Sequence, residues 1–472
     1  MNAAGEPGIV IPPEISRPAS DEVGTMGSDL ARNVEKHIRH LTESIGVRLA
    51  GSHGERAAAD YTAEQLRAAG AEASVEEFPV NERHVTEERL ELRRGPRWMR
   101  FPCSLLSNVP GTNGQMVEAP LLFFDSHTEY DREDLSLLTG KAVVHLGTHI
   151  ETVEHYRRLV EAKPAFVMLV DTRFPADVPT ADGMFPAYTK AYGAVPMVSV
   201  AYLHAWRWKA EGFEGARLRV QGGMRPSTSE NVIGVLPGLE GAGSRPSEPG
   251  RDPMRRDLVF VGGHHDTQAD SVGADDNAVG VAAAIELARL LAPLPRRRTV
   301  RLISFGAEEQ LSVGSAEYVR RHREEIEGRG LFAFNFDAVG SLLGWSKLTC
   351  NGPTEMAVYL RDCFRKRGVY VKTSHAVIPY ADHFPFVAAG VASAWLGRSN
   401  CETGRFFHHR PDDTIERIDM DITAAQIQAA ADALAPLIQE SEPPFGVQIP
   451  DAQRREAQRV WESLFGGWQG LG

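Results

Sequence analysis

The sequence lacks several features that would assign it to a common class of protein. Its four cysteines, Cys103, Cys350, Cys363 and Cys401, show no Cys-x-x-Cys spacing, which disfavours a cysteine-bound zinc site and is typical of reduced thiols. No apolar run approaches the roughly 18–20 residues of a membrane-spanning helix. The first thirty residues have neither a cationic start nor an apolar core, so they do not resemble a signal peptide. We therefore expect a cytoplasmic protein without a membrane partner.

Positive charge is also in deficit. The chain has 51 Lys and Arg against 63 Asp and Glu, which gives a net charge of −12. Phosphate binding needs a cationic face, so nucleic acid is not expected as a partner. The hydrophobic fraction of 42% is ordinary for a protein with a full core. The length of 472 residues predicts two domains, or one large domain with an insertion.

The first half of the chain changes in texture near residue 111. Residues 1–24 are rich in proline and are expected to form a flexible lead-in, and residues 25–110 to form the first part of the main domain. Ser52 followed by Glu55 resembles a capping box that opens a helix, with a strand after it. Residues 111–227 contain four short apolar runs separated by polar loops, which predicts a small β-rich insertion domain.

The second half alternates apolar strands with helices. Residues 228–440 contain the strand-like NVIGVL, LVFVGG, TVRLISF and LFAFNF, with a helix predicted over 279–291. This pattern is typical of an α/β fold whose mixed, mostly parallel central sheet is flanked by helices. Residues 441–472 carry apolar residues at helical spacing, which predicts a helix packed on its own domain or at a subunit contact.

Candidate metal ligands follow the ends of the predicted strands. LVFVGG runs into His264, TVRLISF leads to Glu308 and Glu309, and LFAFNF runs into Asp337. In α/β sheets, ligands bind at the carboxyl ends of the strands. Adjacent carboxylates after a buried strand repel one another unless a cation or proton lies between them. A carboxylate that ends an apolar strand is likewise costly unless it is paired.

Three further residues complete the candidate set. Asp266 follows His264 closely enough to accept a hydrogen bond from its second ring nitrogen. Asp276 stands before the predicted helix, where capping that helix is the alternative role for Asp275 or Asp276. His409 lies in a segment, FFHHRPDDT, that no hydrophobic pattern explains.

These ligand types suit zinc, with cobalt or manganese as substitutes. The five predicted ligands are His264, Asp276, Glu309, Asp337 and His409. Five ligands exceed the three that a one-zinc catalytic site uses, so we expect two ions with one bridging carboxylate. Glu308 is then left as a general base for the water held between the ions.

Six segments in order resemble metallopeptidase family twenty-eight, which includes aminopeptidases, carboxypeptidase Q, glutamate carboxypeptidase II and glutaminyl cyclases. The segments are GGHHDT, GADDNAVG, GAEEQ, NFDAVGS, ADHFPFVAAGV and HHRPDDTIERID. The early RLAGSHGERAAADYTAEQLRAAG resembles the N-terminal segment of the family, and the insertion resembles a protease-associated (PA) domain. The resemblance covers roughly residues 30–440 and implies the zinc exopeptidase fold.

The resemblance also implies a role for each position. His264 and Asp337 match the ligands of one zinc, Glu309 and His409 those of the other, and Asp276 the bridging ligand. Glu308 matches the general base, and Asp266 the partner of His264. The resemblance further implies a cis peptide bond between Asp276 and Asn277.

The two neighbouring histidines are distinguished by the family pattern Tyr-His-Thr/Ser-x-x-Asp-Thr. Counting back from Asp413 and Thr414 makes His409 the ligand and puts His408 in the tyrosine position. In relatives this tyrosine donates to the oxyanion, so we predict that role for His408, with Tyr380 as the alternative.

The expected activity is that of an exopeptidase on short peptides. An aminopeptidase is favoured, because the spare carboxylate oxygens of Glu308 and Asp337 could hold a substrate ammonium. A carboxypeptidase or dipeptidase is the alternative and would need a cation, for which Arg398, Arg405 and Arg410 are candidates. A binding protein that has lost catalysis is a third possibility, which the retained ligands disfavour. Self-association through the C-terminal helix or the insertion is also possible.

Overall fold

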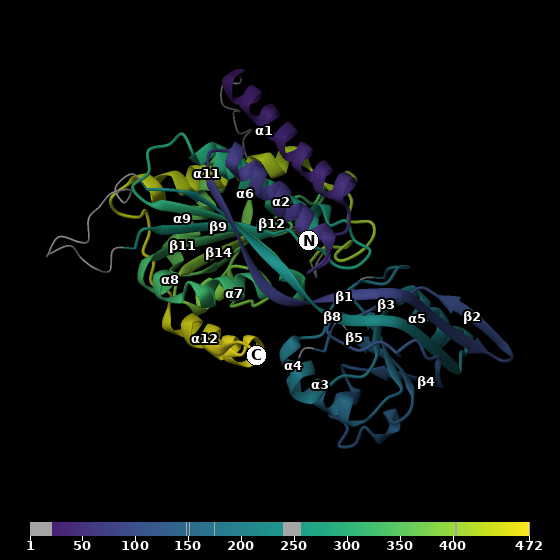
Figure 1. The fold of residues 1–472 in the computed structure, drawn as a ribbon. Helices are drawn as coiled ribbons and strands as arrows, with labels where there is room; N and C mark the ends of the chain where they lie inside the picture. The colour runs from purple at the N-terminus through teal and green to yellow at the C-terminus, as the bar shows by residue number, and fades with distance from the viewer. Residues whose placement is uncertain are drawn as a thin grey trace, which may run out of the picture.

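The computed structural model describes residues 21–471, apart from positions 148, 151, 174, 239–255, 402 and 403. Two lobes lie next to each other, and a long pair of strands, β1 and β8, runs from one into the other (Figure 1). We call them the main lobe and the second lobe. Of the predicted lead-in, residues 1–20 lie outside the described residues, and residues 21–24 begin helix α1 instead.

The main lobe contains a mixed sheet in the order β13-β12-β14-β11-β9-β10-β8, with β1 beside β8. Its strands are β1 (Glu72–Arg94), β8 (Gly215–Leu236), β9 (Leu258–His264), β10 (Thr299–Phe305), β11 (Gly330–Phe336), β12 (Trp345–Asn351), β13 (Val371–Ser374) and β14 (Ala392–Ser399). The central strands β10, β9, β11 and β14 are parallel. This confirms the predicted α/β class, and β9 and β11 are buried along their whole length, as their continuous apolar sequences indicate.

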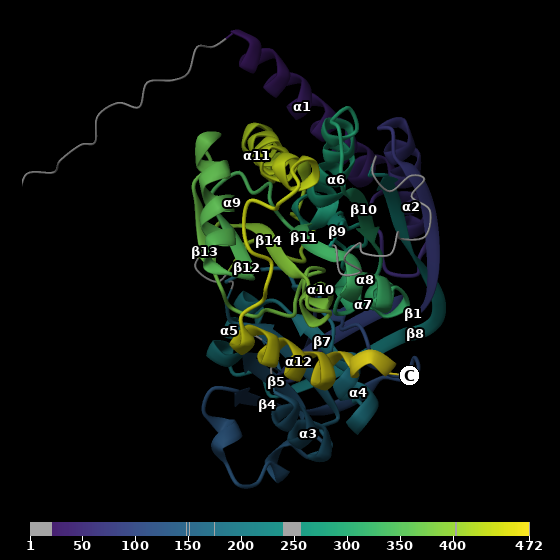
Figure 2. The ribbon, with the colours of Figure 1, turned by 90° about the vertical axis from the view of Figure 1, so that its left-hand side faces the viewer.

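Helices cover both faces of this sheet (Figure 2). One face packs against α1 (Asp21–Arg39), α2 (His53–Ala68), α6 (Val279–Leu291), α9 (Thr354–Lys366) and α11 (Met420–Gln439). The other face packs against α7 (Val313–Arg321), α8 (Arg323–Arg329) and α10 (Phe384–Ala388). Helix α6 has the predicted bounds, and the side chain of Ser52 caps α2 by accepting a hydrogen bond from the backbone N–H of Glu55.

The second lobe has its own core. Its strands and helices are β2 (Arg97–Phe101), β3 (Ser104–Leu105), β4 (Val117–Asp125), β5 (Ala142–Gly147), β6 (Phe166–Asp171), β7 (Met197–Val200), α3 (Val153–Glu161), α4 (Pro186–Tyr192) and α5 (Tyr202–Glu211). The four predicted apolar runs form β4 to β7, which are parallel to one another. Parallel strands need crossover connections, and α3 and α4 supply two of them, which the β-rich prediction did not include.

The ribbon of β1 and β8 belongs to both lobes. The two strands pair from Glu72 opposite Val235 to Arg93 opposite Gly215. Leu90 and Leu92 of β1 pack in the core of the second lobe, although they precede the predicted start of the insertion at residue 111. Because the same strands continue from one core to the other, no break in composition marks where the first core ends.

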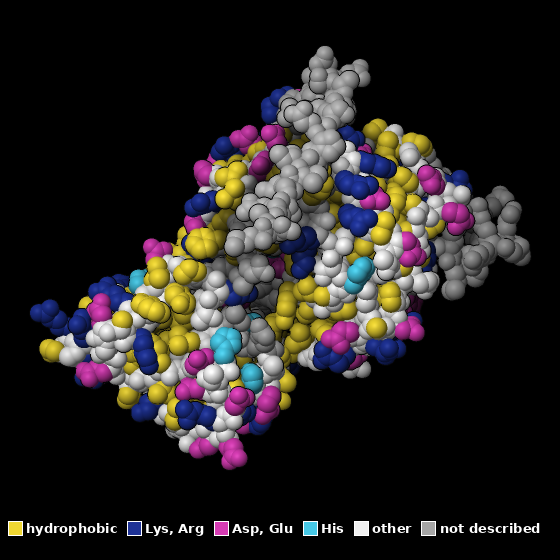
Figure 3. Space-filling view, turned by 180° about the vertical axis from the view of Figure 1, so that it is seen from behind, with side chains coloured by type: hydrophobic (Ala, Val, Ile, Leu, Met, Phe, Trp, Pro, Cys, Tyr) yellow, Lys and Arg dark blue, Asp and Glu magenta, His cyan; other side chains and the backbone are white. Residues whose placement is uncertain are grey.

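The C-terminal segment forms α12 (Asp451–Phe465) and packs on the main lobe. Trp461 is fully buried, and its ring and that of Phe465 contact Phe384 of α10. This confirms the predicted docking of the helix on its own domain. Acidic and basic side chains are interspersed over both lobes on the face seen in Figure 3. Among the described helices, none is long and apolar enough to cross a bilayer.

Candidate metal centre

The predicted ligands meet at one edge of the sheet. His264 is the last residue of β9, and Asp337 follows the end of β11 directly. Glu308 and Glu309 lie in a short helical turn (η5, Glu308–Gln310) just after β10. Because β10, β9 and β11 are parallel neighbours, their carboxyl ends share an edge, and the side chains that follow them converge.

Asp276 lies between the two predicted metal positions. Its Oδ1 is 3.1 Å from Nε2 of His264, and its Oδ2 is 3.4 Å from Nε2 of His409. On the first side, Nε2 of His264 is 3.8 Å from Oδ1 of Asp337. On the second, Nε2 of His409 is 2.9 Å from Oε2 of Glu309. One carboxylate oxygen of Asp276 therefore faces each side, as a bridging ligand requires.

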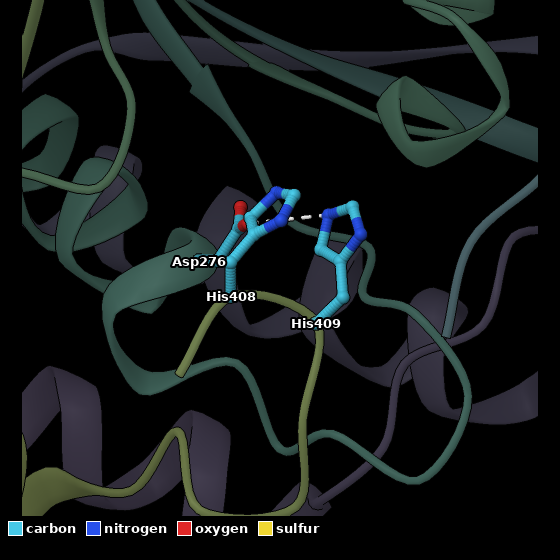
Figure 4. A group of neighbouring side chains, drawn as sticks. All are labelled: Asp276, His408 and His409. Atoms are coloured by element: carbon cyan, nitrogen blue, oxygen red, sulfur yellow. Dashed lines mark ion pairs between the residues drawn. The ribbon is translucent and has the colours of Figure 1, made fainter. Parts of the chain in front are cut away.

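His408 and His409 both lie beside Asp276 (Figure 4). Their rings are stacked, with centroids 3.4 Å apart, and Nε2 of His408 is 3.7 Å from Oδ2 of Asp276. His408 makes no ion pair with Glu309 among the described contacts, whereas His409 does. Burial lowers the pKa of His408 well below its usual value, and His409 and Arg405 lower it further.

Asp266 supports the site in two ways. Its backbone carbonyl and its carboxylate lie 3.2 Å and 3.4 Å from Nδ1 of His264. Asp266 is therefore close enough to accept the predicted hydrogen bond from this ring nitrogen. The carboxylate also accepts hydrogen bonds from the backbone N–H groups of Glu308 and Glu309, at 3.0 Å and 3.1 Å. Asp266 thereby fixes the turn that carries both glutamates.

The loop of Asp275 and Asp276 is held by buried carboxylates whose roles the sequence did not reveal. Asp413 accepts hydrogen bonds from the backbone N–H groups of Asp275 and Asp276, at 2.9 Å and 3.0 Å. Asp275 in turn accepts from the backbone N–H of Gly340 and the hydroxyl of Ser341. Neither aspartate caps α6, so the alternative role is wrong. The Asp276–Asn277 peptide is cis, as expected.

Arg48 also supports these loops, and its role was not predicted from the sequence. Its side chain is fully buried, and its guanidinium donates only to backbone carbonyls among the described residues. The acceptors are Leu41, Gly46, His265, Val272 and Gly273. Arg48 therefore ties the segment after His264 to the N-terminal helices.

The three candidate arginines have different surroundings. Arg405 is only 13% exposed and donates a hydrogen bond to Oδ2 of Asp276, with its other terminal nitrogen 3.8 Å from Oδ1 of Asp337. Arg398 donates to the carbonyl of Ser341. Arg410 donates to the carbonyl of Phe406 and to Asp412, away from the centre. Arg405 alone of the three contacts the predicted ligands.

The residues present fit a metal. Three buried ligand atoms form no hydrogen bond of good geometry among the described residues, although polar groups lie within 3.1–3.8 Å of the first and the third: Nε2 of His264, Oε1 of Glu309 and Oδ1 of Asp337. Leaving such atoms unpaired is costly, and a cation would satisfy them. Two ligand atoms of a tetrahedral zinc ion with bonds of 2.0–2.2 Å lie about 3.3–3.6 Å apart, and the separations of 2.9–3.8 Å within each group are close to this.

Glu308 points toward the same space without joining either ligand group. Its Oε1 accepts a hydrogen bond from the hydroxyl of Ser312, and its Oε2 is 3.8 Å from Nε2 of His264. Burial raises the pKa of Glu308 well above its usual range, His264 opposes this, and the charges of Asp382 and Asp337 reinforce it.

A cavity of about 500 Å³ opens over these residues. Its floor comes from the main lobe, and the second lobe contributes an opposite wall that includes His149, Arg173 and Phe185. Tyr380, the alternative oxyanion donor, lies on the rim with its ring stacked on Phe185 at 6.1 Å and half of its surface exposed. Cavities of this size accommodate small molecules and short peptides.

Comparison with known proteins identifies the family of the part of the chain that carries these residues. Residues 247–434, which include every predicted ligand, match the sequence profile of Peptidase family M28. This region is a peptidase M28 domain. The family prediction made from the six sequence segments is confirmed, and with it the prediction of a metal-dependent peptidase.

Relatives and solved structures extend the likeness to both lobes. The chain is 25% identical to aminopeptidase YwaD of Bacillus subtilis over 92% of this chain and 90% of that protein. It is 26% identical to bovine carboxypeptidase Q over 60% of each chain. The zinc aminopeptidase BSAP of B. subtilis has a similar fold, with a TM-score of 0.70 at 22% identity over 89% of this chain and 98% of that one. A peptidase M28 precursor from Shewanella amazonensis reaches a TM-score of 0.73 at 19% identity, over 90% and 99%.

Proposed function

We propose that this protein is a zinc-dependent metallo-exopeptidase that removes the N-terminal residue of short peptides. The observation that carries the proposal is the carboxylate of Asp276, which has one oxygen near His264 and the other near His409. This arrangement suits two ions that share a carboxylate. The likeness to aminopeptidase YwaD along nearly the whole chain supports aminopeptidase activity.

Each ion would be held by residues of one group. We assign His264 and Asp337 to one zinc and Glu309 and His409 to the other, with Asp276 between them. Bound there, the ions would polarise the scissile carbonyl and lower the pKa of a water molecule. Asp266 would keep His264 oriented through its Nδ1 and hold the turn of the glutamates.

Glu308 would move the protons. Its Oε2 points toward the space between the ligand groups, where it can take a proton from the attacking water. It would then pass that proton to the amine of the leaving product. The hydroxyl of Ser312 holds the other oxygen of Glu308 and keeps the side chain in place. His408 would donate to the oxyanion from beside Asp276, with Tyr380 on the rim as the alternative donor.

Recognition of the free amino terminus would fall to carboxylate oxygens of Glu308 and Asp337. The second lobe, which we propose is a PA-like domain, forms a wall of the cavity and would restrict access to short peptides. A carboxypeptidase or dipeptidase is the second candidate, favoured by the likeness to carboxypeptidase Q. All four cysteines lie in the described part of the chain and remain thiols, which supports a cytoplasmic location. Self-association through α12 or the second lobe stays a prediction. The apolar side of α12 packs on the main lobe, so this side is not available for a subunit contact.

Metal analysis and a substrate panel test the proposal together. Elemental analysis of the purified protein should find about two zinc ions per chain, as expected for a two-metal hydrolytic site. The protein should also cleave aminoacyl-anilides and free-amino dipeptides. Glu308→Gln should retain the zinc and lose turnover by several orders of magnitude. Cleavage of N-blocked substrates alone would contradict the aminopeptidase assignment. A protein without zinc or hydrolytic activity would be a binding homologue instead.

A further inference from the structure

One wall of the cavity carries a cation that the proposed reaction does not use. Lys347 of β12 is half-buried and lines the cavity, and its ammonium forms no hydrogen bond or ion pair with any residue in the described part of the chain. The arginines of the same cavity are engaged: Arg173 pairs with Asp171, Arg398 with the carbonyl of Ser341, and Arg405 with Asp276. A cation that pairs with no described protein group, at the wall of a cavity of this size, is available to an anionic group of a bound molecule.

The strand pattern directs this side chain into the cavity. Leu348 points into the core of the main lobe, so the alternation of β12 puts Lys347 and Thr349 on the opposite face, where both line the cavity. In the neighbouring strand β14, Gly397 lies directly opposite Lys347, and Trp395 lies opposite Thr349. Glycine has no side chain, so the position of β14 directly opposite places none over Lys347. The indole N–H of Trp395 likewise has no hydrogen-bond acceptor among the described residues.

The distance to the metal ligands suits a short peptide. Strand β14 separates β12 from β11, which Asp337 follows directly, so two strand spacings, about 10 Å, lie between them. An extended peptide advances about 3.3–3.6 Å per residue. A peptide whose scissile carbonyl lies at the ligands would therefore bring a carboxylate one or two residues further on within reach of the Lys347 side chain.

We propose that Lys347 binds a carboxylate of the substrate, namely the C-terminal carboxylate of a di- or tripeptide. This inference rests on the proposed peptidase function and narrows its substrate class. The acidic residues around the metal ligands attract the amino end of a zwitterionic peptide, and Lys347 attracts its other end. A carboxylate on the side chain of an acidic residue has the same chemistry, and the test separates the two sources.

The test compares substrates that differ in one charge. A neutral dipeptide is assayed as the free acid and as its C-terminal amide, beside an aminoacyl-anilide that has no carboxylate. A second pair, Ala-Asp-amide and Ala-Asn-amide, reports on a side-chain carboxylate. Three variants are compared. Lys347→Met keeps an unbranched side chain of similar length without the charge, and Lys347→Arg keeps the charge. The control, Lys366→Met, removes an exposed cation of α9.

The native protein should prefer the free acid over the amide by tenfold or more in kcat/KM, mostly through KM. Lys347→Met should lose this preference, Lys347→Arg should regain part of it, and Lys366→Met should keep it. Loss of the Asp-over-Asn preference instead would assign the site to a side-chain carboxylate. Both preferences unchanged in Lys347→Met would overturn the proposal. Hydrolysis of the anilide should stay within twofold in every variant, and its absence in the native protein would refute the peptidase function itself.

Discussion

The guanidinium of Arg405 donates a hydrogen bond to Oδ2 of Asp276, the same oxygen that faces His408 and His409. A fixed positive charge beside a metal ligand opposes the binding of a dication by Coulomb repulsion, and the side chain is too buried for water to screen it fully. We predict that Arg405→Gln, which keeps hydrogen-bond donors and removes the charge, binds zinc at least about tenfold more tightly. Competition with a chelator measures this affinity without reference to turnover.

Arg410→Gln is the matched control, because Arg410 lies on the same loop and donates to Phe406 and Asp412 instead. It should leave zinc affinity within about twofold of the native value. Weaker zinc binding in Arg405→Gln would show that Arg405 mainly orients Asp276, and the repulsion argument would then be wrong.

The two stacked histidines should differ in what their removal does. His409 is near both Asp276 and Glu309, so His409→Ala should lose zinc from one of the two positions. His408→Phe keeps a ring against His409 and removes the donor, so we predict full zinc content and a kcat about 10²–10³-fold lower. Elemental analysis and steady-state kinetics on the same preparations make the distinction. Loss of zinc from His408→Phe would mean that His408 is itself a ligand.

Arg48 should matter for stability, because it satisfies several buried carbonyls in the loops behind the site. Replacing it with Met leaves those acceptors without a donor, at about 1–3 kcal/mol for each one that water cannot reach. We predict a loss of at least about 3 kcal/mol in the free energy of unfolding, measured by urea denaturation. Arg56→Met, on the exposed side of α2, should change it by less than about 0.5 kcal/mol. Similar losses in the two variants would show that the loops hold without Arg48.

The sequence predicts best those elements whose pattern of apolar and polar residues is compatible with only one kind of structure. The strands β9 and β11 are mostly apolar because they are buried on both faces, and the buried part of β10 is mostly apolar as well. A polar ligand ends β9 or follows β10 and β11 at the same sheet edge. Helix α6 consists mostly of apolar residues, and both of its predicted bounds are confirmed. Convergence of His264, Glu309 and Asp337 then follows from the order of parallel strands alone.

What sequence could not predict depends on contacts between distant segments. Arg48 acts through backbone carbonyls far along the chain, and carbonyls leave no mark in a sequence. The family pattern assigns His409 from its spacing to Asp413. The hydrogen bonds from the loop of Asp276 to Asp413 could not be predicted, because they depend on how these two distant segments fold together. The helices α3 and α4 are only nine and seven residues long, so the longer apolar runs around them dominated the pattern and the second lobe resembled a module of strands alone.

The second lobe should lose stability in mild acid because of His145. This residue of β5 is fully buried, its Nε2 lies 3.1 Å from the hydroxyl of Tyr130, and burial lowers its pKa from 6.5 to about 3. Below pH 6.5 this histidine is therefore protonated in the unfolded chain but stays neutral in the folded chain. Its contribution lowers the free energy of unfolding by about 1.4 kcal/mol for each pH unit below 6.5. The loss continues down to the folded pKa, and no loss from His145 is expected above pH 6.5.

His145→Gln removes the titrating group, so its urea midpoint should fall less than that of the native protein between pH 7.5 and 5.5. The difference should correspond to about 1.4 kcal/mol, one pH unit below the unfolded pKa. His127→Gln, at an exposed position of the same lobe, should follow the native pH dependence. If His145→Gln and the native protein lost stability in parallel, His145 would accept its proton without unfolding, and burial would not be what sets its pKa.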